Sequence, residues 1–115
     1  AYMSKDIVKE LGFGPVGHAE EVETSHMMAR YPDMVHLEKA IDNPIKDTPL
    51  YSVVPTYEHD TLCYVPSTLE HAKAAAKKSG GCTGEPSKSD ARRGQIYHNH
   101  LVKNLIAVVE QLQNA

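Results

Sequence analysis

The chain has 115 residues, of which 41% are hydrophobic and 23% are charged, and its net charge is -3. This composition is ordinary for a soluble globular protein, and the length allows one small domain with a modest core. The negative net charge argues against a nucleic-acid binder, and no stretch approaches the roughly eighteen apolar residues that would span a membrane. We therefore expect residues 1–115 to belong to one globular domain that binds neither nucleic acid nor membrane.

The two cysteines, Cys63 and Cys82, lie far apart and form no C-x-x-C motif. Free thiols in a reducing compartment are therefore favoured over a disulfide, and a zinc finger is set aside because it needs closely spaced ligand pairs. No signal peptide is visible in the sequence. These observations predict a cytoplasmic location.

The first part of the chain predicts two helices separated by a glycine-rich turn. Ser4 is a suitable N-cap for a short helix over residues 5–11, which Gly12 would end. A turn with three glycines and one proline follows to residue 17, and residues 19–30 form the second predicted helix. The apolar positions of this second helix recur at roughly helical spacing: Val22, Met28 and Ala29.

His18 stands at the start of the second predicted helix, beside Glu20, Glu21 and Glu23. Acidic residues in a first turn interact favourably with the helix dipole, which accounts for Glu20 and Glu21. The dipole does not account for His18, because a charged imidazole would be unfavourable there. His18 beside Glu23 is consistent with an acid/base pair or with a pair of metal ligands, and both alternatives stay open.

Residues 31–66 are predicted to be irregular, because five prolines break any long element. Within this region residues 50–54 and 62–65 are rich in β-branched and aromatic residues and predict two short strands. A loop region of this length is usually functional or packs on a neighbouring chain.

Two further helices are predicted, over residues 67–78 and 90–113. Ser67 or Thr68 would cap the first, and the second carries one apolar stripe that should pack on a sheet. Gly94 interrupts the first turns of this last helix and suggests a close backbone approach there. The stripe consists of Ile96, Leu101, Leu105, Val108, Val109 and Leu112.

The other histidines have no obvious common site. His98 and His100 would point about 200° apart on a helix, so one metal ion cannot readily take both, and surface or interface roles are favoured. His26 follows Glu23 by three residues and is a candidate for a hydrogen bond to it. The remaining ones are expected to be solvated: His36, His59 and His71.

Residues 17–35 resemble the signature of the creatininase family. Gly17 and His18 are followed by Glu23-Thr24-Ser25, an apolar helix and Tyr31-Pro32 with Val35 three residues later. A second match lies about sixty residues downstream, where Gly84-Glu85-Pro86 precedes Arg93-Gly94 and an amphipathic helix. Two motifs in the right order are more specific than either one alone, and the resemblance covers nearly the whole chain.

This resemblance implies a three-layer α/β/α creatininase-like fold with a mostly parallel sheet, of which this chain is the C-terminal part. Tyr2 would align just after a central strand of such a fold. Family members are longer, and their N-terminal part supplies the Glu, His and Asp ligands of a two-metal centre. We therefore expect metal ligands mostly on another chain and none of them securely here. The chain could arise by proteolysis, by self-processing or as one subunit of a natural heteromer, and a higher oligomer is expected.

The resemblance also implies a function, the hydrolysis of a cyclic amide or cyclic carbonyl compound by water activated on two divalent ions (Zn, Mn or Fe). By position His18 matches the family's catalytic histidine, and Glu23 matches an acid that orients His18 or a metal ligand. Gly17 and Glu20 are the candidate substrate-binding residues.

The predicted substrate is small and polar. Creatininase itself has a Trp and an Asp that contact creatinine just before the motif, whereas this chain has Gly14 and Pro15 and no Trp. An oxidised cyclitol such as 3-dehydro-scyllo-inosose suits the charged surroundings of His18 better than creatinine. The alternative is a non-catalytic creatininase-like subunit that completes a fold and builds an oligomer interface.

Overall fold

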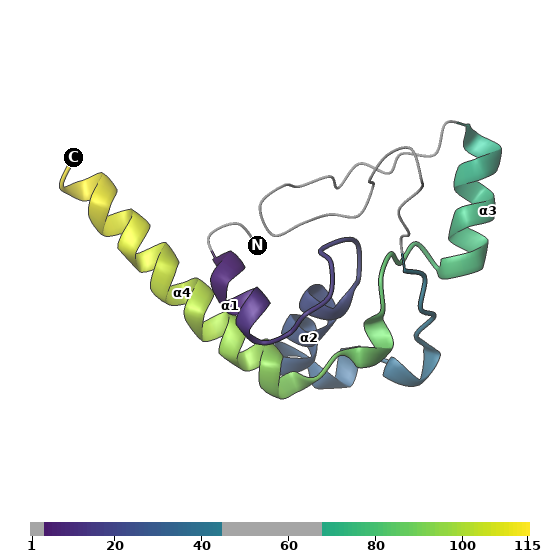
Figure 1. Cartoon of the computed structure of the whole chain (residues 1–115), viewed down its shortest axis with the longest axis horizontal. Coiled ribbons are helices and arrows are strands. Elements are labelled where there is room, and N and C mark those ends of the chain that lie inside the picture. Colours follow the sequence, from purple (N-terminus) through teal and green to yellow (C-terminus); the bar gives the residue numbers. More distant parts are fainter. Residues whose placement is uncertain (1–3, 45–67) are drawn as a thin grey trace.

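The longest element is α4 (Ala91–Gln113), and α2 (Glu21–Arg30) packs across its first half (Figure 1). The structure is a computed structural model, which describes residues 4–44 and 68–115. The short helix α1 (Lys5–Glu10) lies on the same part of α4. Helices α1 and α2 thus gather around the N-terminal half of α4, whereas its C-terminal half projects away from them.

A small apolar core fills the space where these helices meet. Its buried members come from α1, from the turn that follows it, from α2 and from α4: Val8, Phe13, Val22 and Tyr97. Ile7, Leu11 and Leu101 pack against this cluster. The core is modest, as expected for a short chain, and it holds the turn of residues 12–17 against α4.

Gly94 lies where α2 and α4 cross. A Cβ atom at this position would lie 1.8 Å from the backbone oxygen of Ser25, closer than any side chain allows. The Ser25 hydroxyl in turn accepts a hydrogen bond of 3.0 Å from the Asp90 backbone N–H, at the start of α4. The close backbone approach predicted at Gly94 is therefore confirmed, and it involves α2.

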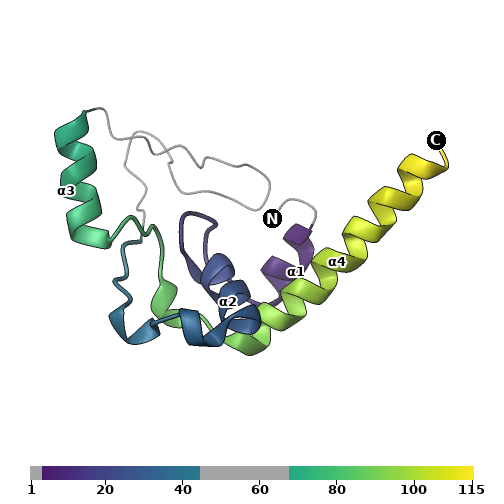
Figure 2. The ribbon, with the colours of Figure 1, turned by 180° about the vertical axis from the view of Figure 1, so that it is seen from behind.

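The other described elements lie on the opposite side of α2 from α1 (Figure 2). Short 3-10 turns occur at Pro32–Met34, Leu37–Lys39 and Pro86–Lys88, and helix α3 (Leu69–Ser79) stands apart from the other helices. Gly80 ends α3 in the left-handed conformation, with φ of 63°.

Each of the four predicted helices is present, with ends that differ by one or two residues. The helix predicted from residue 19 begins at Glu21 because Glu20 caps it. Ser4 stands before α1, but its hydroxyl makes no cap hydrogen bond and lies 3.3 Å from His100 Nδ1. Thr68 caps α3, whereas Ser67 lies outside the described residues.

The predicted sheet is not tested by the described residues. Residues 50–54 and 62–65, predicted as strands, lie outside the described residues, as do Cys63 and His59. Within residues 4–44 and 68–115 the only β pairing is an isolated antiparallel bridge between Asn43 and Gly84. The three-layer α/β/α arrangement therefore stays a prediction.

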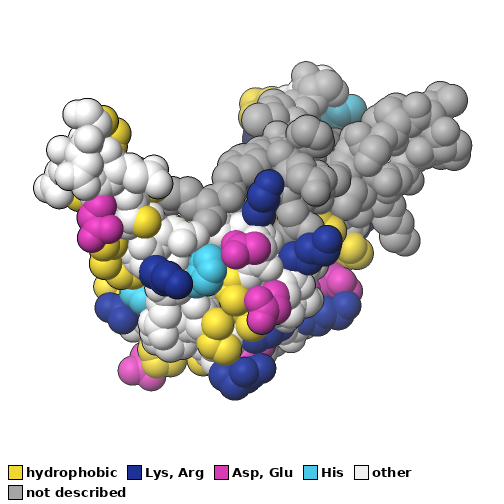
Figure 3. Space-filling view, turned by 60° about the vertical axis from the view of Figure 1, so that its left-hand side comes forward, with side chains coloured by type: hydrophobic (Ala, Val, Ile, Leu, Met, Phe, Trp, Pro, Cys, Tyr) yellow, Lys and Arg dark blue, Asp and Glu magenta, His cyan; other side chains and the backbone are white. Residues whose placement is uncertain are grey.

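The projecting half of α4 exposes much of the apolar stripe that was expected to pack on a sheet. In Figure 3 hydrophobic side chains follow this part of the helix, while acidic and basic side chains are mixed over the body. Leu105 is 45% exposed and Val109 is 52% exposed. Two further members of the stripe, Val108 and Leu112, are exposed. The neighbouring Val102 and Ile106, which the predicted stripe did not include, are exposed as well.

Candidate functional site

The candidate site is built on the N-terminus of α2, where Glu20 is the N-cap. Its two carboxylate oxygens accept hydrogen bonds from the backbone N–H groups of Val22 and Glu23, at 2.9 and 3.0 Å. The side chain is 1% exposed. Burial raises the pKa of Glu20 to about 7, against the two backbone hydrogen bonds, and the charges of Glu23 and Glu21 add to the rise. Glu20 is thus a buried carboxyl that titrates near neutral pH.

Glu23 holds the backbone next to His18. Its Oε2 accepts a hydrogen bond of 2.7 Å from the Ala19 N–H, and the Thr24 hydroxyl donates to the Ala19 carbonyl at 2.9 Å. Ala19 has a positive φ of 49°, a conformation that non-glycine residues rarely adopt. The family resemblance implies that Glu23 orients His18 or a metal ligand. The contact observed here acts on the peptide that follows His18.

His18 is held from the other side by Thr83, which is 65 residues away in the sequence. The His18 N–H donates to the Thr83 hydroxyl at 2.7 Å, and the Thr83 N–H donates to the His18 carbonyl at 2.9 Å. A Cβ atom on Gly17 would lie 2.3 Å from the Thr83 hydroxyl oxygen, so only glycine allows this approach. His18 itself is exposed. The backbone of His18 is therefore fixed while its side chain faces solvent.

Glu21 connects the glycine-rich turn to α4. Its Oε1 accepts a hydrogen bond of 3.2 Å from the Gly14 N–H, and its Oε2 lies 3.2 Å from Arg93 Nη1. The Arg93 guanidinium also lies over the Phe13 ring, 4.4 Å from its centre. Arg93 further contacts Asp90, the N-cap of α4. These contacts fix the turn on the far side from His18.

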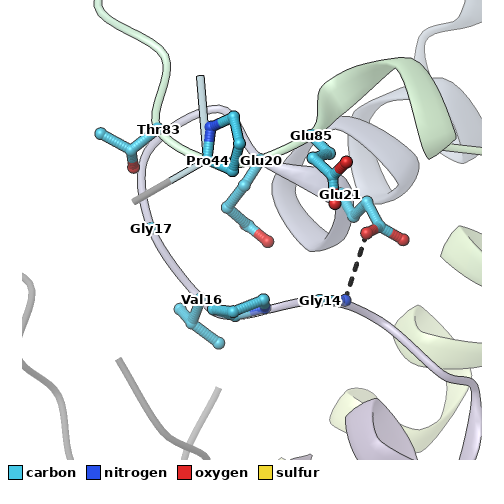
Figure 4. Close-up of a pocket in the computed structure, with 10 residues that line it drawn as sticks. Gly14, Val16, Gly17, Glu20, Glu21, Pro44, Thr83 and Glu85 are labelled. Atoms are coloured by element: carbon cyan, nitrogen blue, oxygen red, sulfur yellow. Dashed lines mark hydrogen bonds between the residues drawn. The ribbon is translucent and has the colours of Figure 1, made fainter. Parts of the chain in front are cut away.

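A hollow of about 40 Å³, partly open to solvent, lies between the turn and residues 83–85. Figure 4 shows the Glu20 side chain pointing into it and the Glu21 carboxylate bonded to Gly14 at its edge. Of the predicted site residues, Gly17 and Glu20 line this hollow, whereas His18 and Glu23 lie outside its lining. The predicted residues thus meet at the start of α2, but they divide into a buried pair at the hollow and an exposed pair beside it.

The match to known proteins decides the family. A family model described as "Creatininase: Creatinine amidohydrolase" matches residues 4–109. The chain belongs to the creatininase family. This match confirms the family resemblance seen in the two motifs, which lie inside the matched residues.

A creatinine amidohydrolase of Pseudomonas putida is 38% identical to this creatininase-family chain over 65 residues. These residues are 56% of the chain and 24% of the relative, so the match spans well under half of the relative's length. No solved structure gives a significant match.

In this creatininase-family chain, three contact residues of the site were missed by sequence reasoning. Thr83, Glu21 and Arg93 act through partners 65 to 72 positions away, which spacing along the chain does not reveal. The one available signal was the second motif: it includes Arg93-Gly94 and begins directly after Thr83.

The other described histidines take separate places. His26 contacts His98 rather than Glu23, with 2.8 Å between His26 Nε2 and His98 Nδ1. His100 lies 3.5 Å from the Asp6 carboxylate, so His98 and His100 do point to different partners, as the helical spacing predicted. His36 lies beside Glu38 and, like His71, is exposed.

Two further findings concern the described residues. Cys82 is a free cysteine, and burial raises the pKa of its thiol, which lies 3.5 Å from the Ala19 carbonyl. In residues 4–44 and 68–115, no helix is long and apolar enough to cross a membrane.

Proposed function

We propose that this chain contributes to the active site of a hydrolase that acts on a cyclic amide or a cyclic carbonyl compound, with His18 as the acid/base group. The observation that carries the proposal is the placement of His18. The chain belongs to the creatininase family, and His18 is exposed on a backbone that hydrogen bonds to Thr83 and Glu23 fix in place. His18 lies beside the hollow into which the Glu20 side chain points.

The local structure supports a proton-transfer role for His18. A general acid or base must lie within hydrogen-bond reach of the proton that it moves, so its position has to be defined before the substrate binds. Hydrogen bonds on both sides of the His18 peptide supply that definition. The exposed imidazole can then take up a proton from a substrate, or return one, and exchange it with bulk water.

We propose a small, polar, hydroxyl-bearing substrate such as an oxidised cyclitol, with 3-dehydro-scyllo-inosose as the example. Gly17 and Glu20 line the hollow, and Glu21 and Glu85 add two further carboxylates to its wall. Carboxylates accept hydrogen bonds from substrate hydroxyl groups. Gly14 and Pro15, which also line the hollow, offer no aromatic surface for a flat ring such as creatinine.

The residues described here do not by themselves fit a metal centre. Within residues 4–44 and 68–115, no three His, Cys, Asp or Glu side chains are placed to hold one metal ion. A catalytic zinc site takes about three protein ligands. We therefore assign no step of the reaction to a metal held by this part of the chain. We propose that two divalent ions (Zn, Mn or Fe) are bound mostly by the N-terminal portion of the same creatininase-like fold.

The test uses the protein in its native assembly and a panel of cyclic amides and oxidised cyclitols. His18→Ala should lower turnover of the accepted substrate by roughly 10²- to 10⁴-fold, the usual cost of losing a general acid/base. Folding and metal content should stay close to those of the unaltered protein. His36→Ala, which changes another exposed histidine, is the matched control. Full turnover in the His18 variant would remove His18 from the mechanism.

A second candidate function is a non-catalytic subunit that completes a creatininase-like fold. The exposed apolar stripe on the projecting half of α4 favours it, because such a surface is typical of an interface. The two candidates differ in one result. An assembly that contains this chain, binds metal and hydrolyses none of the panel would support the second.

A further inference from the structure

Thr83 makes two hydrogen bonds to a single residue, His18. The His18 N–H donates to Thr83 Oγ1 at 2.7 Å, and the Thr83 N–H donates to the His18 carbonyl at 2.9 Å. These two groups flank the His18 Cα atom, and the backbone turns only about φ and ψ on either side of that atom. The two bonds together therefore fix both angles, and with them the direction in which the imidazole leaves the backbone.

We propose that the Thr83 hydroxyl positions His18 for proton transfer, so that Thr83 sets the turnover rate through His18 and without touching the reacting atoms. The inference rests on the proposed acid/base role of His18. Misplacing a reacting group by about 1 Å can cost roughly 10² in rate, so a residue that only orients His18 can have a large effect. The second motif begins directly after Thr83, so this contact joins the two motifs of the family in one catalytic unit.

The backbone after His18 has a conformation that its surroundings must hold. Ala19 has a φ of 49°, in the left-handed region that a residue with a Cβ atom disfavours. Residues stay in this region only where several contacts fix them. Two such contacts meet on the peptide between residues 18 and 19: the Ala19 N–H donates to Glu23 Oε2 at 2.7 Å, and the His18 carbonyl accepts from Thr83. Loss of the Thr83 hydroxyl would free the His18 N–H and let this strained backbone relax, which would turn the imidazole away.

Thr83 is itself held on both sides, as a positioning residue has to be. The next residue, Gly84, exchanges backbone hydrogen bonds of 2.7 and 2.8 Å with Asn43. The Asn43 side-chain amide donates to the carbonyl of the preceding residue, Cys82, at 3.1 Å. Figure 4 shows Thr83 on this segment, close to the backbone of Gly17. The hydroxyl therefore has a fixed place from which to hold His18.

Substitutions at residue 83 separate the hydroxyl from the bulk of the side chain. Serine keeps the hydroxyl that accepts from the His18 N–H. Valine keeps the size and shape of threonine, but it puts a methyl group, which accepts no hydrogen bond, where the hydroxyl was. A positioning role for the hydroxyl predicts that serine and valine behave differently, whereas a role in packing alone does not.

The experiment uses the protein in its native assembly and the cyclic amide or oxidised cyclitol of the panel that it turns over fastest. Thr83→Val should lower kcat by roughly 10- to 100-fold, as the loss of other residues that orient a functional group does, and should leave KM nearly unchanged. Thr83→Ser should restore most of the kcat. Ser87→Ala is the matched control, because it removes a hydroxyl contact to Asp42 from the same segment and does not reach His18.

A second readout does not depend on turnover. Exchange of the His18 amide hydrogen with deuterium is measured by mass spectrometry on peptides that contain His18. Thr83→Val should speed this exchange by at least about tenfold, because the N–H loses its acceptor, and Thr83→Ser should not. If the valine variant fails to assemble, Thr83→Ala replaces it in both measurements, since it also lacks the hydroxyl.

Unchanged kcat in Thr83→Val, with turnover lost in His18→Ala, would overturn the proposal and leave the role of His18 intact. An equal loss of kcat in Ser87→Ala would also overturn it, because loosening of the segment would then explain the effect. Failure of the proposed function gives a different result, which is full turnover in His18→Ala.

Discussion

At the scale of single residues, Glu20 and Glu23 divide the start of α2 between them. Glu20 caps the helix from inside, and Glu23 reaches back to the Ala19 N–H on the exposed side. This reciprocal pattern is a variant of the capping box, in which the third residue of the helix returns a hydrogen bond to the residues before it. Its consequence is that the helix start and the position of His18 are fixed together.

The buried carboxyl of Glu20 should make stability depend on pH. Its pKa in the folded protein, about 7, exceeds the usual 4.5, so the folded state holds the proton more tightly and stability falls as the pH rises from 4.5 to 7. The full effect corresponds to about 3 kcal/mol. Relative to the unaltered protein, Glu20→Gln should gain unfolding free energy between pH 5 and pH 8. A constant difference between the two proteins across this range would contradict the prediction.

Two substitutions at Glu23 separate its charge from its hydrogen bond. Glu23→Gln keeps an oxygen for the Ala19 N–H, so stability should change little while turnover falls by roughly 10- to 100-fold, as for other residues that orient a functional group. Glu23→Ala removes the hydrogen bond as well and should cost about 1 kcal/mol more. Thermal melts and turnover on the same samples measure both effects. Unchanged turnover in Glu23→Gln would limit Glu23 to a structural role.

Much of this site could be predicted from the sequence, because its signals are local. A histidine beside acids after a glycine-rich turn made His18 and Glu23 candidates, and the family resemblance added Glu20. Their division into a buried and an exposed pair could not be predicted, since it depends on Thr83 and Gly84 approaching from far along the chain.

At the scale of elements, the crossing of α2 and α4 sets the geometry of the molecule. Gly94 allows the helices to touch, and Arg93 beside it forms an ion pair with Glu21 at the start of α2. Both helices were predicted from their apolar spacing, which is a local signal. Their crossing was not, because it needs a contact between positions about 70 residues apart.

Gly94→Ala should disrupt this crossing. Alanine gains up to about 1 kcal/mol over glycine inside a helix, but the added Cβ would meet the Ser25 backbone oxygen, which cannot move without shifting α2. The cost of overpacking, about 3 kcal/mol or more at so close a contact, should prevail. Chemical denaturation measures the change, with Gln95→Ala at the next, exposed position as the control. A Gly94 variant as stable as this control would contradict the crossing.

At the scale of the whole molecule, the chain buries one end of α4 and exposes the other. An apolar stripe that is half exposed over several turns is typical of a surface that contacts another polypeptide. The predicted strands that could cover it lie outside the described residues, so sequence and structure together leave the predicted sheet untested.

Charges placed on this stripe should break the assembly and leave the body folded. Leu105→Glu together with Val109→Glu puts two carboxylates on the exposed apolar side of α4. Burying these charges in an interface would cost a large free energy of desolvation. Size-exclusion chromatography should show a smaller species whose helix content is retained. Gln111→Glu is the control on the same helix. An unchanged elution volume for the double variant would exclude the stripe as an interface.

The central claim, that this chain works as one part of a creatininase-type hydrolase, is tested most directly by native mass spectrometry of the protein as it occurs in its source. The account predicts that the polypeptide that carries residues 1–115 occurs in an assembly that contains divalent metal ions. A metal-free monomer that melts cooperatively would contradict it.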